Sequence, residues 1–125
     1  MAKKLASQPI GVRSSLVTSH AHAQVHHELE RFFAAPDDRV FYCNDGASVN
    51  SIGALASHLR TMNGHVYASH ANDYKNDFSA WLRDVHKEHE LADRLICAKN
   101  KDHAAKIITN HIVAALHDAA HRSAW

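Results

Sequence analysis

Side chains able to do chemistry gather most densely between Ser69 and Val85, around Trp81. A helix that only packs into a core needs an apolar stripe, whereas this stretch also carries acids, amides and a histidine. Trp and Arg contribute much of the energy of protein interfaces, so the polar edge beside the tryptophan is a candidate surface for a protein partner. The residues of this predicted edge are His70, Asn72, Asn76, Asp77, Trp81, Arg83 and Asp84.

The same groups match no known catalytic motif. Asp77 with Asp84, or His70 with Asp77, would act as a general acid and base only if folding brought them into reach. The sequence has no nucleophile elbow, phosphate-binding loop or dinucleotide fingerprint, so we expect no enzymatic activity. The plainer interpretation of the edge is that Asn72 caps a helix, Trp81 packs in the core and the charges are solvated.

Histidine is the unusual residue in the composition, with thirteen among 125 residues. His22 and His26 lie four positions apart, as do His117 and His121, and this spacing places two imidazoles on one helix face, as in many metal sites. Chance gives some such pairs at this histidine content. We expect no cofactor, and the alternative function is metal-binding or pH-responsive, with His22 and His26 at the core boundary as ligands for Zn²⁺, Ni²⁺ or Cu²⁺.

Charge and length limit the class of protein. The chain has the length of one domain and can bury a core without disulfide or metal staples. Its formal net charge is +1 with neutral histidines, which gives no basic field for nucleic acid. Lys99, Lys101 and Lys106 gather near the start of the last predicted helix and make nucleic-acid contact a further, less favoured alternative.

Cysteine usage and hydropathy point to a cytoplasmic protein. Cys43 and Cys97 lie outside any C-x-x-C pair and fit ordinary buried thiols in a reducing compartment. No apolar run approaches the ~20 residues that cross a bilayer, so we expect no membrane contact.

Hydrophobic periodicity predicts a mostly α-helical single domain, a bundle of about five helices with a small β-hairpin. Residues 1–13 are expected to form a flexible tail and 14–125 the domain. The first helix should run from Ser14 or Ser15, as N-cap, to Ala35 before Pro36. Residues 39–43 and 47–49 then form the hairpin around an Asn-Asp-Gly turn.

Four further helices are expected beyond the hairpin. The first is capped by Asn50 or Ser51 and ends at Asn63-Gly64 with a left-handed cap, before a connector over 65–71. The second starts after Asn72, with Tyr74, Phe78, Trp81, Leu82 and Val85 on one face. A short helix follows around 91–96. The last opens at Asn100 or Asp102, with His111 as a core histidine that is hydrogen-bonded or packs between helices.

The stretch around Trp81 resembles a family of small archaeal and bacterial domains of unknown function with a segment reading roughly YHVNxxKNDFxNWIxDV. The upstream FYCNDGASVNSIGALASHLRTM is similar to that family's turn-plus-helix stretch, and the resemblance covers about residues 40–106. Ser69 stands where the family has Tyr, and Leu82 where it often has Ile. The matching residues are His70, Asn72, Lys75, Asn76, Asp77, Phe78, Trp81, Arg83, Asp84 and Val85.

The resemblance implies a shared fold and a significance for the block, and it implies no activity. Together with the missing catalytic motifs, it leads us to expect a non-enzymatic protein-interaction or oligomerisation module. The hairpin, the Trp81 helix and the N-terminal helix are the expected docking elements, and self-association or a protein partner is expected.

Overall fold

A computed structural model describes the backbone of residues 12–34 and 39–123, and side chains from Ala23 to Ala34 and from Arg39 to His121. Within this part the chain forms six helices and one β-hairpin, which confirms the mostly helical class with a small hairpin. The elements are α2 (Val12–Phe33), β1 (Phe41–Tyr42), β2 (Ser48–Val49), α3 (Ile52–Thr61), α4 (Gly64–His70), α5 (Asp77–Asp84), α6 (His89–Ile96) and α7 (Lys101–Ser123).

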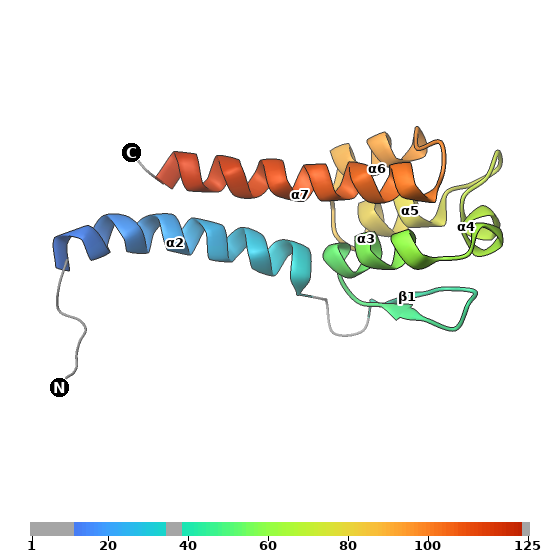
Figure 1. Cartoon of the computed structure of the whole chain (residues 1–125), viewed down its shortest axis with the longest axis horizontal. Helices are drawn as coiled ribbons and strands as arrows, with labels where there is room; N and C mark the ends of the chain where they lie inside the picture. Colours follow the sequence, from blue (N-terminus) through green and yellow to red (C-terminus); the bar gives the residue numbers. More distant parts are fainter. Residues whose placement is uncertain (1–11, 35–38, 124–125) are drawn as a thin grey trace.

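The two long helices, α2 and α7, lie side by side and run in opposite directions (Figure 1). The shorter helices α3 to α6 and the hairpin gather around the first half of α7 and the end of α2. The start of α2 and the end of α7 therefore project together beyond this compact part. Over that length each of the two helices has only the other as a neighbouring helix (Figure 1).

One core joins all these elements. Helix α3 buries Ile52, Leu55 and Leu59 against α7, where Ala104 and Ile108 face inward at helical spacing. The aromatic rings of the hairpin and of α5 close the other side, with Phe41 tilted over Phe78 at 5.1 Å. The strands pair in antiparallel register, Phe41 opposite Val49. Burying one side chain of each strand in this core gives the short hairpin the cover that it needs in water.

The helix ends correct several expectations. Helix α2 begins at Val12, so Ser14 and Ser15 lie inside the helix and are not its cap. Residues 1–11, most of the predicted tail, lie outside the described residues. Asn63 and Gly64 do not close α3 with a left-handed cap, since the Asn63 side chain accepts from the His65 amide at 2.8 Å and starts α4. The predicted connector over 65–71 is thus mostly helix.

The start of the tryptophan helix also differs from the prediction. Asn72 does not cap it, because its side chain accepts from the Tyr74 amide at 2.9 Å and closes a tight turn. The cap is Asn76, which accepts from the Ser79 amide at 3.0 Å. Tyr74 consequently stands in the turn, 96% exposed, and not on the buried face of α5. Phe78, Trp81 and Leu82 are buried as expected.

Other caps agree with the sequence. Ser51 accepts from the Ala54 amide at 3.1 Å and starts α3, and Asn100 accepts from the His103 amide at 2.8 Å at the start of α7. In the described part of the chain no helix is both long and apolar enough to cross a bilayer.

Candidate functional site

Most polar groups of the predicted edge around Trp81 bind other groups of the same chain. His70 is buried, and its ring links three segments: Nε2 accepts from the Asn44 amide at 3.0 Å, and Nδ1 lies 3.0 Å from Asp77 Oδ2. Burial alone would raise the pKa of Asp77, but hydrogen bonds from His70 and Lys75 outweigh it and lower that pKa. This arrangement fixes the hairpin turn to the start of α5.

The amides and the indole of the edge have partners within the chain as well. Asn72 Nδ2 donates to the Ala68 carbonyl at 3.0 Å. Asn76 Nδ2 donates weakly to the Leu95 carbonyl at 3.4 Å. Trp81 is 7% exposed, and its Nε1 donates to the Arg39 carbonyl at 2.9 Å. The plainer interpretation is therefore right that Trp81 packs in the core and wrong that Asn72 caps the helix, since Asn76 is the cap.

Arg83 and Asp84 complete the edge. Arg83 pairs with Asp93 of α6 in a short contact, whereas Asp84 is exposed and has no ion pair or hydrogen bond among the described side chains. Asn72, Asn76 and Arg83, with the exposed Tyr74 and Ile96, line a groove of about 300 Å³. The edge as a docking surface stays a prediction, and Tyr74, which was not part of it, is the most accessible residue of the adjoining groove.

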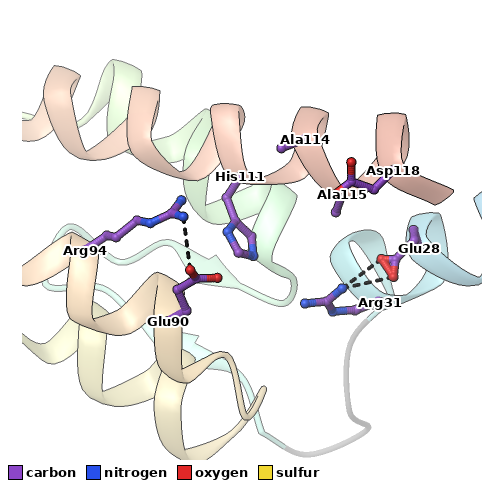
Figure 2. Close-up of a pocket in the computed structure, with 8 residues that line it drawn as sticks. All are labelled: Glu28, Arg31, Glu90, Arg94, His111, Ala114, Ala115 and Asp118. Carbon is purple, nitrogen blue, oxygen red and sulfur yellow. Dashed lines mark hydrogen bonds and ion pairs between the residues drawn. The ribbon is translucent and has the colours of Figure 1, made fainter. Parts of the chain in front are cut away.

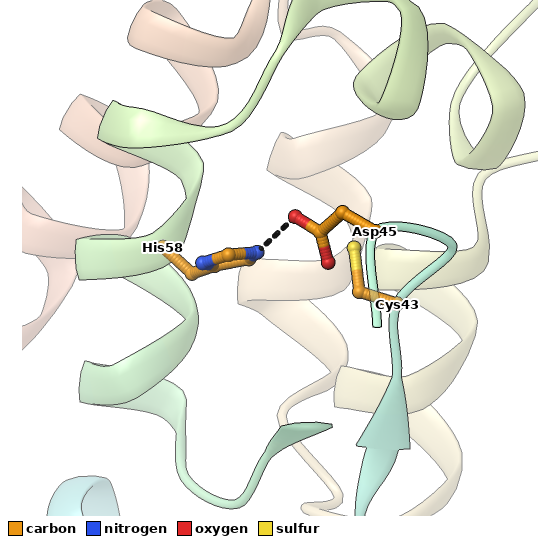
Figure 3. A group of neighbouring side chains, drawn as sticks. All are labelled: Cys43, Asp45 and His58. Atoms are coloured by element: carbon orange, nitrogen blue, oxygen red, sulfur yellow. Dashed lines mark hydrogen bonds and ion pairs between the residues drawn. The ribbon is translucent and has the colours of Figure 1, made fainter. Parts of the chain in front are cut away.

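A second group of reactive side chains lies where the hairpin turn meets α3 (Figure 3). Cys43 Sγ, a carboxylate oxygen of Asp45 and a ring nitrogen of His58 all lie within 4.8 Å of one another. His58 reaches from α3 to the turn, and its Nε2 is 2.7 Å from Asp45 Oδ2. The other carboxylate oxygen accepts from the Ala47 amide at 2.9 Å. We call Cys43, Asp45 and His58 the hairpin cluster.

The protonation states of the hairpin cluster follow from its surroundings. The Ala47 amide, with a further contribution from His58, lowers the pKa of Asp45. Burial raises the pKa of the Cys43 thiol, so this sulfur is protonated at neutral pH and is not an activated nucleophile. Cys43 is buried and unpaired as expected, whereas Cys97 is unpaired but exposed, which corrects the expectation of two buried thiols.

A network of buried charges ties α2 to α6 and α7. Lys87 adopts a left-handed conformation, φ +59°, and the chain then turns so that Glu88 is 6% exposed. Arg31 donates to both carboxylate oxygens of Glu88, at 2.5 and 2.7 Å, and to Glu28 at 2.8 Å. His111 Nε2 lies 3.4 Å from Glu88 Oε1, within ion-pair distance but without hydrogen-bond geometry. We call Glu28, Arg31, Glu88 and His111 the buried charge network.

The pKa of Glu88 reports the strength of this network. Burial by itself would raise the pKa, but His111 and the hydrogen bonds from Arg31 outweigh burial and lower it from 4.5 to about 2. His111 also packs its ring edge-on against Phe32, at 5.8 Å, so the expected helix-packing role of this histidine is confirmed.

A cavity of about 260 Å³ opens on the solvent side of the network (Figure 2). Its lining carries both positively and negatively charged side chains, and each arginine is already paired with a carboxylate. Arg31 pairs with Glu28, and Arg94 pairs with Glu90 at 3.3 Å. The cavity is therefore a polar recess over a structural network. No side chain of the recess points to one class of ligand.

The opposite side of the α2–α7 pair is apolar. Leu29, Phe33 and Val113 are 40%, 55% and 58% exposed. Phe33, Ile112, Val113 and Leu116 line a groove of about 310 Å³ between α2, α3 and α7. The Phe33 ring lies directly over Gly53, where an added Cβ would come within 2.1 Å of ring atom Cε1. We call Leu29, Phe33, Ile112, Val113 and Leu116 the apolar face.

The predicted histidine and lysine sites are dispersed. His26 does not lie at the core boundary: its side chain is 63% exposed and lies 3.8 Å from Glu30, and the side chain of His22 is outside the described residues. His117 and His121 are exposed on α7 with their rings 4.1 Å apart.

Of the three predicted lysines, Lys101 binds the Arg60 carbonyl and Asp102. Lys99 and Lys106 are exposed.

The hairpin cluster and the buried charge network were missed from the sequence. A Cys-x-Asp pair in a turn followed by a histidine on the next helix is too common a pattern to single out. Arg31 and Glu88 are 57 positions apart and carry no local signal. Comparison of the chain with protein-family models, curated proteins and solved structures found no match.

Proposed function

We propose that the protein is a non-enzymatic interaction module that associates with a second copy of itself through the apolar face. The observation that carries this proposal is the exposure of three large apolar side chains on one side of a two-helix pair. A contiguous apolar groove on a small protein commonly marks a binding surface. The N-terminal helix, one of the expected docking elements, contributes Leu29 and Phe33 to it.

The shape of the pair supports a second copy as the occupant. Leu29 and Phe33 lie one turn apart on α2, as do Ile112 and Leu116 on α7, so the apolar face is a compact patch that runs across both helices. Two copies related by a two-fold axis can bury this same patch on both chains. Two such pairs placed face to face form a four-helix bundle, in which the remaining apolar sides are buried.

The charges at the margin are compatible with this packing. Glu30 is exposed near the α2 edge of the face, whereas Lys106 is exposed near the α7 edge and Arg60 borders the groove from α3. A two-fold axis parallel to the helices places α2 of one copy opposite α7 of the other, so the acidic edge of one copy can meet the basic edge of the other. Such rim pairs contribute more to orientation than to affinity.

A mutation pair tests the proposal. Val113→Asp places a charge in the proposed interface and, because Val113 is more than half exposed, it leaves the core of one copy intact. We expect sedimentation velocity to give a concentration-dependent dimer for the wild-type protein, and a dissociation constant at least roughly 30-fold higher for the variant, about 2 kcal/mol. Circular dichroism checks that the fold is kept.

Tyr74→Ser is the matched control, since Tyr74 is the most exposed aromatic residue of the described part and lies in the groove beside the predicted edge, away from the apolar face. It should leave association unchanged. A wild-type protein that stays monomeric at high concentration contradicts the proposal. Loss of the dimer on Tyr74→Ser with no effect of Val113→Asp would move the interface to the edge around Trp81. The two unpaired cysteines fit a reducing compartment, and we propose the cytoplasm.

A further inference from the structure

The hairpin cluster brings three different donor types together in one place. Its sulfur, carboxylate oxygen and imidazole nitrogen lie within 4.8 Å of one another, and the closest pair, His58 Nε2 and Asp45 Oδ2, is 2.7 Å apart. Among the described residues, no fourth His, Cys, Asp or Glu joins the group. Three protein ligands with one open position are the ligand count of catalytic and exchangeable zinc sites.

Two backbone segments position the ligands: the hairpin turn carries Cys43 and Asp45, and helix α3 carries His58. The turn is closed by hydrogen bonds from the Cys43 amide to the Ala47 carbonyl, 2.9 Å, and from the Gly46 amide to the Cys43 carbonyl, 3.0 Å. Gly46 supplies the left-handed φ of +91° that this turn needs. His58 belongs to α3, whose Leu55 and Leu59 are fully buried. The ligands are therefore placed before any ion arrives, which lowers the cost of ordering them.

The spacing suits a tetrahedral ion. Zinc bonds of about 2.3 Å to sulfur and 2.0–2.2 Å to nitrogen and oxygen put neighbouring ligand atoms about 3.4–3.6 Å apart. The separation of His58 Nε2 and Asp45 Oδ2, 2.7 Å, is shorter than this, and no separation in the hairpin cluster exceeds 4.8 Å. Side-chain movements of about 1 Å would therefore seat all three ligands. The two outer ligands permit such a movement, since the side chains of Asp45 and His58 are 26% and 24% exposed.

We infer that Cys43, Asp45 and His58 bind a thiophilic divalent metal ion of the Zn²⁺ class. The ion replaces the thiol proton, which leaves to solvent, and the thiolate and carboxylate then balance its charge, with the neutral form of the His58 imidazole as the third ligand. A sulfur ligand together with an imidazole selects Zn²⁺ or Co²⁺ over Mg²⁺ and Ca²⁺, which prefer oxygen. Water takes the open position on the exposed side.

The proposed metal site is independent of the apolar face. At 100° per residue, His58 lies on a different flank of α3 from Gly53, Ala56 and Arg60, which border the apolar groove. A failure of either proposal leaves the other standing, and each has its own variants.

Cobalt titration of the full chain, purified without an affinity tag, tests the inference. A thiolate ligand gives Co²⁺ an intense ligand-to-metal charge-transfer band that the thirteen histidines cannot give, so the band separates this site from adventitious imidazole binding. We expect one Co²⁺ per chain with this band, displaced by Zn²⁺. Cys43→Ala should abolish the band, and His58→Asn should weaken affinity at least about 100-fold, more than the roughly 10–100-fold typical of residues behind the ligands.

Two control variants and one further variant of a proposed ligand complete the experiment. Cys97→Ala removes the other cysteine, and His26→Ala removes a residue of the metal site predicted from the sequence; both should leave the band intact. Asp45→Asn retains an oxygen for the Ala47 amide, so it tests the carboxylate with the turn preserved. Absence of the band in the wild-type protein, or its loss on Cys97→Ala and survival on Cys43→Ala, would overturn the site. Circular dichroism confirms that each variant is folded, and Zn²⁺ should raise the melting temperature of the wild type but not of His58→Asn.

Discussion

Glu88 offers the most direct test of how the fold is held together, because it is a buried acid bound by an arginine from another helix. Glu88→Gln preserves the shape and keeps a hydrogen-bond acceptor for Arg31, but it removes the charge. With a pKa near 4.5 in the unfolded chain and about 2 in the folded one, ionised Glu88 contributes about 3 kcal/mol to the free energy of unfolding at pH 7. The substitution should cost an amount of this order, in the range seen when one partner of a buried ion pair is removed.

The contribution of Glu88 to the free energy of unfolding should decrease at acidic pH. The folded pKa lies below the unfolded one, so the contribution is complete above about pH 5 and declines as the pH falls toward 2. Near pH 3 roughly half of it remains. The difference in stability between wild type and Glu88→Gln should therefore narrow by about half between pH 7 and pH 3, while self-repulsion from charged histidines affects both proteins equally.

Urea unfolding followed by far-ultraviolet circular dichroism measures this difference. Glu90→Gln is the matched control: Glu90 lies two residues further on, in the first turn of α6, and also pairs with an arginine, but its side chain is 73% exposed. We expect the control to change stability by less than about 0.5 kcal/mol. A cost below about 1 kcal/mol for Glu88→Gln at pH 7, or one that does not change with pH, would refute the assigned role of Arg31 and His111.

Two further substitutions probe the apolar face and the tryptophan helix. Gly53→Ala must displace the Phe33 ring, so it should weaken the proposed dimer in sedimentation velocity. The free energy of unfolding of one copy should change by less than about 1 kcal/mol, because the gain in helix propensity from glycine to alanine, about 1 kcal/mol, offsets the cost of displacing the ring. Asn76→Ala removes the cap of α5 and should lower the unfolding free energy by about 1 kcal/mol, with exposed Asn110→Ala as a control that stays within about 0.5 kcal/mol. An equal effect of the two would contradict the capping role.

Local sequence signals predicted the elements where one strong determinant acts alone. The apolar spacing of Leu55 and Leu59 and the cap at Ser51 place α3, and the Asn-Asp-Gly turn places the hairpin. These signals gave a wrong prediction where two residues were suitable for the same role. Asn72 and Asn76 are both good N-cap residues, but Asn76 is the N-cap of α5 because the Asn72 side chain and backbone close the preceding turn.

The polar groups around Trp81 show the limit of composition as a guide to function. The sequence singled them out as more than a packing stripe needs, but it could not identify the groups that they bind. In the folded chain, His70 reaches back to the hairpin and Trp81 to Arg39, 42 positions away. A surplus of specific polar groups is therefore as compatible with cross-linking distant segments as with recognition of a partner.

The sequence alone predicted a mostly helical fold with a small hairpin, since helix and turn formation depend on residues within a few positions of one another. Tertiary structure decided the rest. It joined Arg31 to Glu88, brought His58 to Cys43 and Asp45, and left one side of the α2–α7 pair bare. These outcomes depend on how helices pack across long separations, where the relative placement of two surfaces, and not the identity of either residue, determines which groups meet.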